Sequence, residues 1–123
     1  MAERQRRVLV VEDDEAIGDL LQQALIDEGG YDVRRACDGV EALDVLGGWR
    51  PDVIVLDLMM PRMDGWRFRE EQVRRGIAAD VPILVASASR RAESLTLEFA
   101  RAVIRKPFDL GELLALVAEL AGG

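Results

Sequence analysis

Three short apolar runs, at residues 8–11, 53–56 and 82–86, are separated by longer stretches of mixed apolar and polar residues. A strand inside a parallel sheet is covered on both faces, so it is apolar throughout rather than alternating. We therefore expect three buried parallel strands at these runs. Residues 31–36 and 102–104 are weaker strand candidates, and the two arginines in the first of them suit a strand at the edge of a sheet.

The stretches between these runs place apolar residues at helical spacing. Helices are expected at residues 15–28, 39–46, 65–75 and 93–100, and in the segment that follows Asp109. The expected apolar face of the first helix consists of Ile17, Leu20, Leu21, Ala24 and Leu25.

Three aspartates stand immediately before expected helices. Asp14, Asp64 and Asp109 each offer a carboxylate oxygen that can accept a hydrogen bond from a free backbone N–H of the first turn. We read each of them as a helix cap.

Five strands alternating with five helices indicate an α/β fold, a doubly wound five-stranded parallel sheet with helices on both faces. The chain has 123 residues, which fits one domain over 1–123. Its last residues, Ala121-Gly122-Gly123, follow directly after the final helix, and we expect from this a protein of one domain rather than one domain cut from a larger protein.

Charge and cysteine content narrow the function classes. The net charge of −7 argues against direct nucleic-acid binding, because a polyanion would be repelled. No apolar run is long enough to cross a bilayer. The single cysteine, Cys37, cannot form an internal disulfide and fits a reducing cytoplasm. We expect it to be a packing residue, and Trp49 and Trp66 to be partly buried aromatics.

The residues that directly follow the strands carry the chemistry. Ligands of open parallel sheets bind beyond the carboxyl ends of the strands. At those ends stand Glu12 and Asp13, then Asp57, then Ser87, and finally Lys106, which is the only lysine of the chain. Acids, a hydroxyl and an ammonium are therefore expected to meet on one rim.

Such a set suits phosphoryl transfer with a divalent cation. Clustered carboxylates repel one another, and Mg²⁺, which prefers oxygen ligands, relieves the repulsion. Asp57 could then act as a nucleophile toward phosphorus. Mg²⁺ and Lys106 would neutralise charge on the phosphoryl oxygens, and Ser87 could donate a hydrogen bond to one of them.

Three segments carry a family resemblance: Val-Leu-Val-Val-Glu-Asp-Asp, Val-Ile-Val-Leu-Asp-Leu-Met-Met-Pro-Arg-Met-Asp-Gly and Lys-Pro-Phe. In this order and spacing they resemble the receiver domains of bacterial two-component response regulators, over nearly the whole chain. The resemblance implies a flavodoxin-like three-layer sandwich with strand order 2-1-3-4-5. It also implies phosphorelay signalling in the cytoplasm, with a sensor histidine kinase or a histidine phosphotransfer protein as the phosphoryl donor.

The resemblance assigns a role to each rim residue. Asp57 would be the phospho-acceptor, Asp13 a direct Mg²⁺ ligand and Glu12 a ligand mainly through water. The backbone carbonyl of Met59 would be the remaining protein ligand. Ser87 and Lys106 would contact the phosphoryl group, and the Lys106–Pro107 bond would be cis. Such a domain catalyses its own phosphorylation and dephosphorylation but is not a turnover enzyme.

The sequence departs from the family pattern near its end. Three residues before the lysine, where the family usually has an aromatic that swings inward, stands Val103, which has no ring. The segment from Ser87 to Lys106 is a few residues short, and Ala100-Arg101-Ala102 replaces the usual Gly-Ala. The expected output surface is therefore atypical, while the phosphorylation chemistry is intact.

Three other functions are alternatives to phosphoryl acceptance by Asp57. A haloacid-dehalogenase-like phosphatase needs a second acid two residues after the nucleophile, where Met59 stands. A flavin-binding protein would not place three acids after its first strand. The remaining alternative is a receiver-like interaction module that is never phosphorylated; such modules typically lose an acid or the lysine, and none is lost here.

Overall fold

The structure is a computed structural model that describes residues 4–88 and 98–122. Its strands are β1 (Arg7–Val11), β2 (Asp32–Ala36), β3 (Val53–Leu56), β4 (Ile83–Ser87) and β5 (Ala102–Arg105). Its helices are α1 (Glu15–Gly29), α2 (Gly39–Leu46), α3 (Gly65–Arg75) and α5 (Leu110–Leu120). No helix within the described ranges combines the length and apolar character that a membrane span requires.

The five strands form one parallel sheet in the order β2-β1-β3-β4-β5. This confirms the expected doubly wound topology, and β2 lies at an edge as its arginines suggested. The fifth expected helix, at residues 93–100, falls mainly on residues outside the described ranges; residues 98 and 99 form a turn.

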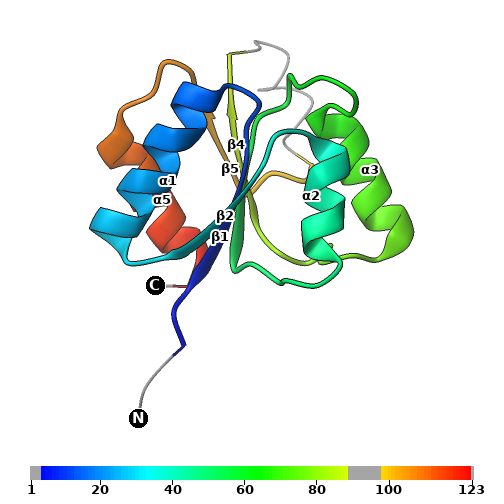
Figure 1. The fold of residues 1–123 in the computed structure, drawn as a ribbon, viewed down its shortest axis with the longest axis horizontal. Helices are drawn as coiled ribbons and strands as arrows, with labels where there is room; N and C mark the ends of the chain where they lie inside the picture. Colours follow the sequence, from blue (N-terminus) through cyan, green and yellow to red (C-terminus); the bar gives the residue numbers. More distant parts are fainter. Residues whose placement is uncertain (1–3, 89–97, 123) are drawn as a thin grey trace.

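The helices cover the two faces of the sheet in pairs. Helices α1 and α5 lie on one face, and α2 and α3 lie on the other (Figure 1). Successive residues of β1 point alternately to the two faces of the sheet. Leu9 and Val11 belong to one apolar cluster, and Val8 and Val10 belong to the other. All four are fully buried, which explains why the strand reads as continuously apolar.

Side-chain caps fix where the helices begin. Asp14, Asp64 and Asp109 each accept a hydrogen bond from a backbone N–H of the first turn, as expected. Asp38 caps α2 in the same way through the N–H of Glu41. These caps set the register of each helix directly after the rim loops.

Three burial expectations were wrong. Cys37 is exposed, because it lies in the turn after β2, and its thiol donates a hydrogen bond to Glu41. Leu20 is 53% exposed, because it lies at the margin of the apolar face of α1. Trp49 is more buried than expected, since its ring lies in the apolar cluster and two arginine guanidinium groups stack over it.

Candidate functional site

The rim residues come together at the carboxyl edge of the sheet. Glu12 follows β1 and Asp57 follows β3, the two strands on either side of the point where strand order reverses. The N–H of Asp57 donates to the carbonyl of Val11 over 2.9 Å, which ties the two strand ends together. The site is therefore built on strand termini rather than on a long loop.

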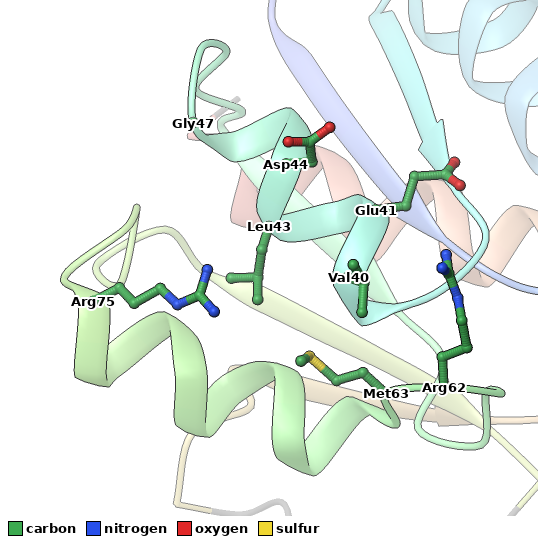
Figure 2. A pocket seen from close by; sticks show the side chains of 8 residues that line it. All are labelled: Val40, Glu41, Leu43, Asp44, Gly47, Arg62, Met63 and Arg75. Carbon is green, nitrogen blue, oxygen red and sulfur yellow. The ribbon is translucent and has the colours of Figure 1, made fainter.

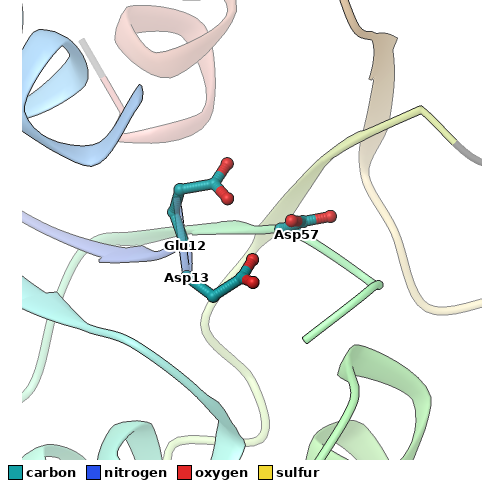
Figure 3. A group of neighbouring side chains, drawn as sticks. All are labelled: Glu12, Asp13 and Asp57. Carbon is teal, nitrogen blue, oxygen red and sulfur yellow. The ribbon is translucent and has the colours of Figure 1, made fainter. Parts of the chain in front are cut away.

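Three carboxylates form the centre of this site. Glu12, Asp13 and Asp57 each offer an oxygen, and these oxygens lie within 4.8 Å of one another (Figure 3). Glu12 and Asp57 are 4% and 6% exposed, whereas Asp13 faces solvent. Two buried acids with one exposed acid form a pocket that an ion can enter from one side.

The ammonium group of Lys106 supplies a positive charge beside these carboxylates. Its Nζ lies 2.5 Å from Oε1 of Glu12 and 3.3 Å from Oδ2 of Asp57. The Lys106–Pro107 peptide bond is cis, as expected, and the N–H of Lys106 donates to the carbonyl of Ser87 over 3.1 Å.

The pKa of Glu12 depends on its burial and on its contact with Lys106. Burial raises the pKa of Glu12 to about 7, against the opposing effects of its hydrogen bonds from Lys106 and from the N–H of Asp14. Burial alone would lower the pKa of Lys106, but its contacts with Glu12 and Asp57 raise it above its usual value. Lys106 therefore stays charged, while Glu12 gains a proton near neutrality unless a further cation is bound.

The donor set fits Mg²⁺. With all three acids ionised, three carboxylates and one ammonium leave two negative charges, which a divalent cation neutralises. All the side-chain donors are oxygens, and one face of the cluster is open to water, as Mg²⁺ requires.

The loop after β3 is held tightly against the site. The N–H of Met59 donates to Oδ1 of Asp57 over 3.2 Å, and the side chain of Met59 is 59% exposed. The N–H of Gly65 donates to the carbonyl of Leu58 over 2.9 Å. A Cβ on Gly65 would stand 2.8 Å from Cα of Leu58, so only glycine fits here.

Ser87 and Val103 lie on the neighbouring strands. Ser87 is the last residue of β4 and is 1% exposed. Val103 is half-buried and packs against the apolar cluster beneath α2 and α3. The structure thus places every expected site residue on or beside the rim.

A contact that sequence reasoning missed joins α2 to the loop after β3. Arg62 Nε donates to the buried carboxylate of Asp38 over 2.6 Å. The only sequence signal was the aspartate-glycine pair before α2, which indicates a cap but not its second partner.

Comparison with known proteins decides the family. The family model described as response regulator receiver domain matches residues 8–118. The chain belongs to the response-regulator receiver family. The receiver is 45% identical over 118 residues to the response regulator MprA of Mycobacterium tuberculosis, a match that covers 93% of this chain and 50% of MprA. It therefore spans about half the length of the curated relatives that it matches.

Solved structures agree with this membership. A Francisella response regulator receiver domain has a TM-score of 0.85 at 30% identity, and the match covers 96% of this chain and 98% of that one. Response regulator TrrA of Thermotoga maritima, in complex with Mg²⁺-BeF, has a TM-score of 0.83 at 31% identity over 94% and 99% of the two chains. The receiver thus has the fold that its sequence predicted.

Proposed function

We propose that this receiver accepts a phosphoryl group on Asp57, with Mg²⁺ bound by the acidic cluster, and that the modification changes a partner-binding surface. The observation that carries the proposal is the pairing of a buried Asp57 with Lys106 and with a divalent-cation cluster on the same rim.

The chemical step is a phosphoryl transfer. An oxygen of Asp57 forms a new bond to phosphorus while the bond from phosphorus to the donor nitrogen of a phosphohistidine breaks. Lys106, 3.3 Å from Asp57, lies where it can offset charge on the transferred oxygens. Water attack on the same phosphorus would reverse the modification, so the domain would catalyse both steps without being a turnover enzyme.

Mg²⁺ would supply neutralisation of the phosphoryl oxygens and orientation of the reacting group. Asp13 and Asp57 would hold it directly, Glu12 mainly through water, and Met59 through its backbone carbonyl. TrrA, solved with Mg²⁺-BeF, supports this assignment by its fold and its 31% identity.

The phosphoryl donor would be a sensor histidine kinase or a histidine phosphotransfer protein in the cytoplasm. An apolar cleft of about 390 Å³ beside Lys106, lined by Ile17, Leu20, Pro107 and Phe108 among others, gives such a partner a surface to dock on. The exposure of Leu20 makes sense on this view, because a partner would cover it.

Ser87 would donate a hydrogen bond to the phosphoryl group and transmit its arrival toward β5. Val103 cannot swing a ring inward, so the response would be carried by displacement of β5 and its flanking loops. The domain itself would contact a partner protein and would not bind nucleic acid directly, because its net charge is −7.

The unphosphorylated interaction module is not favoured. Both acids after β1, the acid after β3 and the lysine after β5 are all present; the three carboxylates cluster, and Lys106 contacts Glu12 and Asp57. A module without phosphorylation gives no reason to keep two carboxylates buried beside each other.

The test is to incubate the protein with Mg²⁺ and acetyl phosphate and record its intact mass. We expect the gain of one phosphoryl group, abolished by EDTA and by Asp57→Asn. Asp80→Asn, which removes an exposed aspartate far from the rim, is the matched control and should be modified like wild type. No gain in wild-type protein would refute the proposal.

A further inference from the structure

An ion pair joins the loop after β3 to α2, and one of its side chains is buried while the other is exposed. The side chain of Asp38 is 2% exposed and that of Arg62 is 61% exposed, and they meet over 2.6 Å. Asp38 also accepts the N–H of Glu41 over 2.9 Å, so both of its oxygens are engaged. A buried carboxylate with two fixed partners is a rigid anchor rather than a solvated surface charge.

A backbone contact reinforces the anchor. The N–H of Gly39 donates to the carbonyl of Met63 over 3.1 Å. A Cβ on Gly39 would stand 2.7 Å from Cγ of Met63, so glycine permits this close approach. An open cavity of about 560 Å³ lies beside α2 and α3, and Arg62 and Met63 stand on its wall (Figure 2). The loop therefore meets the start of α2 through this ion pair and this backbone hydrogen bond.

Arg62 adopts a backbone conformation that favours glycine or asparagine. Its φ is 61°, in the left-handed region, where an arginine is strained. An arginine at this position needs a compensating contact, and the contact present is the one to Asp38.

We propose that Asp38 and Arg62 are positioning residues that hold the loop of residues 57–65 so that the backbone carbonyl of Met59 faces the acidic cluster. The loop would be fixed at two points: at Gly65 against the backbone of Leu58, and at Arg62 against α2. Met59 lies in the chain between Leu58 and Arg62, and its N–H also donates to the carboxylate of Asp57. This inference rests on the Mg²⁺ site of the proposed function and adds the residues that shape it.

The test measures Mg²⁺ binding alone by calorimetric titration, without phosphorylation, at fixed ionic strength and about pH 8, where Glu12 is ionised. Asp38→Asn and Arg62→Gln change the net charge in opposite directions, so an effect through long-range charge would weaken binding in the first and strengthen it in the second. A positioning role weakens both, by about three- to tenfold in Kd, as supporting residues around metal ligands commonly do.

Further variants sharpen the result. The double variant should bind no worse than the weaker single one, because both remove the same contact, and Arg62→Lys should recover part of the loss. Arg50→Gln, in an exposed pair with Asp80, is the charge-matched control and should leave Kd within about twofold. Urea unfolding of each variant verifies that it is folded. Arg62→Gln leaves the carboxylate of Asp38 in place to accept the N–H of Glu41, so the cap of α2 is retained.

Tighter or unchanged Mg²⁺ binding by Arg62→Gln would overturn the inference while leaving the proposed function intact. Wild-type protein that binds no Mg²⁺ would overturn both. Weakened binding in both single variants, with no further loss in the double variant, would establish the anchor.

Discussion

We expect the charge of Glu12 to control how well the acidic cluster holds a cation. Burial raises its pKa to about 7, and only the ionised carboxylate attracts Mg²⁺. We therefore expect Mg²⁺ affinity, measured by calorimetric titration, to rise from about pH 6 to about pH 8 and then to level off. Glu12→Gln should bind more weakly and lose this pH dependence, and an affinity of wild type that is flat over this range would contradict the assignment.

The same pKa fixes the sign of an effect on stability. Without Mg²⁺, the folded-state pKa of Glu12 lies above its ordinary value of 4.5, so the folded state binds the proton more tightly. The contribution of Glu12 to the free energy of unfolding is then favourable at low pH and is lost as pH rises through about 7.

Asp57 is a residue whose proposed function should lower the stability of the fold. It lies buried beside a second carboxylate, and Lys106 contacts both of them. We expect Asp57→Asn, in EDTA at about pH 8 where Glu12 is ionised, to raise the free energy of unfolding by about 1 kcal/mol, because one of two like charges is removed and an acceptor for Lys106 remains. Urea unfolding measures this change.

The control for this prediction is Asp80→Asn, which breaks an exposed pair and should change stability by less than about 0.5 kcal/mol. A clear loss of stability in Asp57→Asn would show that Asp57 is held by favourable contacts and not by strain.

Some site residues could be predicted from the sequence and others could not. Glu12, Asp57 and Lys106 were identified because polar residues directly after apolar strands must lie at the sheet edge. The exposure of Cys37 was missed although the end of β2 at Ala36 was predicted, because sequence alone does not show which way a residue in the turn after a strand points. The pairing of Asp38 with Arg62 was missed because they stand far apart in the chain and no periodic pattern links them.

At the scale of elements, the junction between β3 and α3 is the most tightly built. Gly65 opens α3, and a Cβ there would meet the backbone of Leu58 at 2.8 Å and of Asp57 at 3.0 Å. Backbone cannot yield as a flexible side chain can, so Gly65→Ala should cost about 2 kcal/mol in the free energy of unfolding and weaken Mg²⁺ binding by shifting Met59.

Gly48→Ala is the matched control. A Cβ on Gly48 meets nothing within 4 Å and the residue needs no left-handed backbone, so its effect should lie within about 0.5 kcal/mol. Equal effects of the two changes on unfolding by urea would refute the close-packing argument.

Elements differed in how well their sequence specified them. Residues 53–56 were predicted to the residue as β3, because both faces of a central strand are covered and all four positions are apolar. Helix α1 was placed correctly, but its apolar face was predicted too wide, since spacing alone cannot distinguish Leu20 at the margin from Leu21 in the core.

For the whole molecule, the cluster links cation binding to stability. A ligand that binds only the folded state stabilises it in proportion to the logarithm of its concentration. We expect Mg²⁺ at about a hundred times its Kd to stabilise the domain by about 2.7 kcal/mol, which raises Tm by roughly 10 °C for a domain of this size. Differential scanning calorimetry with K⁺ at matched ionic strength is the control, and an equal shift with K⁺ would exclude a specific site.

The overall topology was predictable because few arrangements satisfy alternating strands and helices with right-handed crossovers. How a phosphoryl group on Asp57 alters the output surface was not, because Val103 replaces the ring whose movement the family pattern would have supplied.

The most direct test of whether Asp57 is the phospho-acceptor locates the phosphoryl group in the chain. Protein modified by acetyl phosphate in Mg²⁺ is reduced with borohydride, which converts an aspartyl phosphate to homoserine, and its peptides are sequenced by mass spectrometry. We predict homoserine at position 57 and at no other aspartate. Homoserine at Asp13 or elsewhere, with Asp57 unchanged, would contradict it.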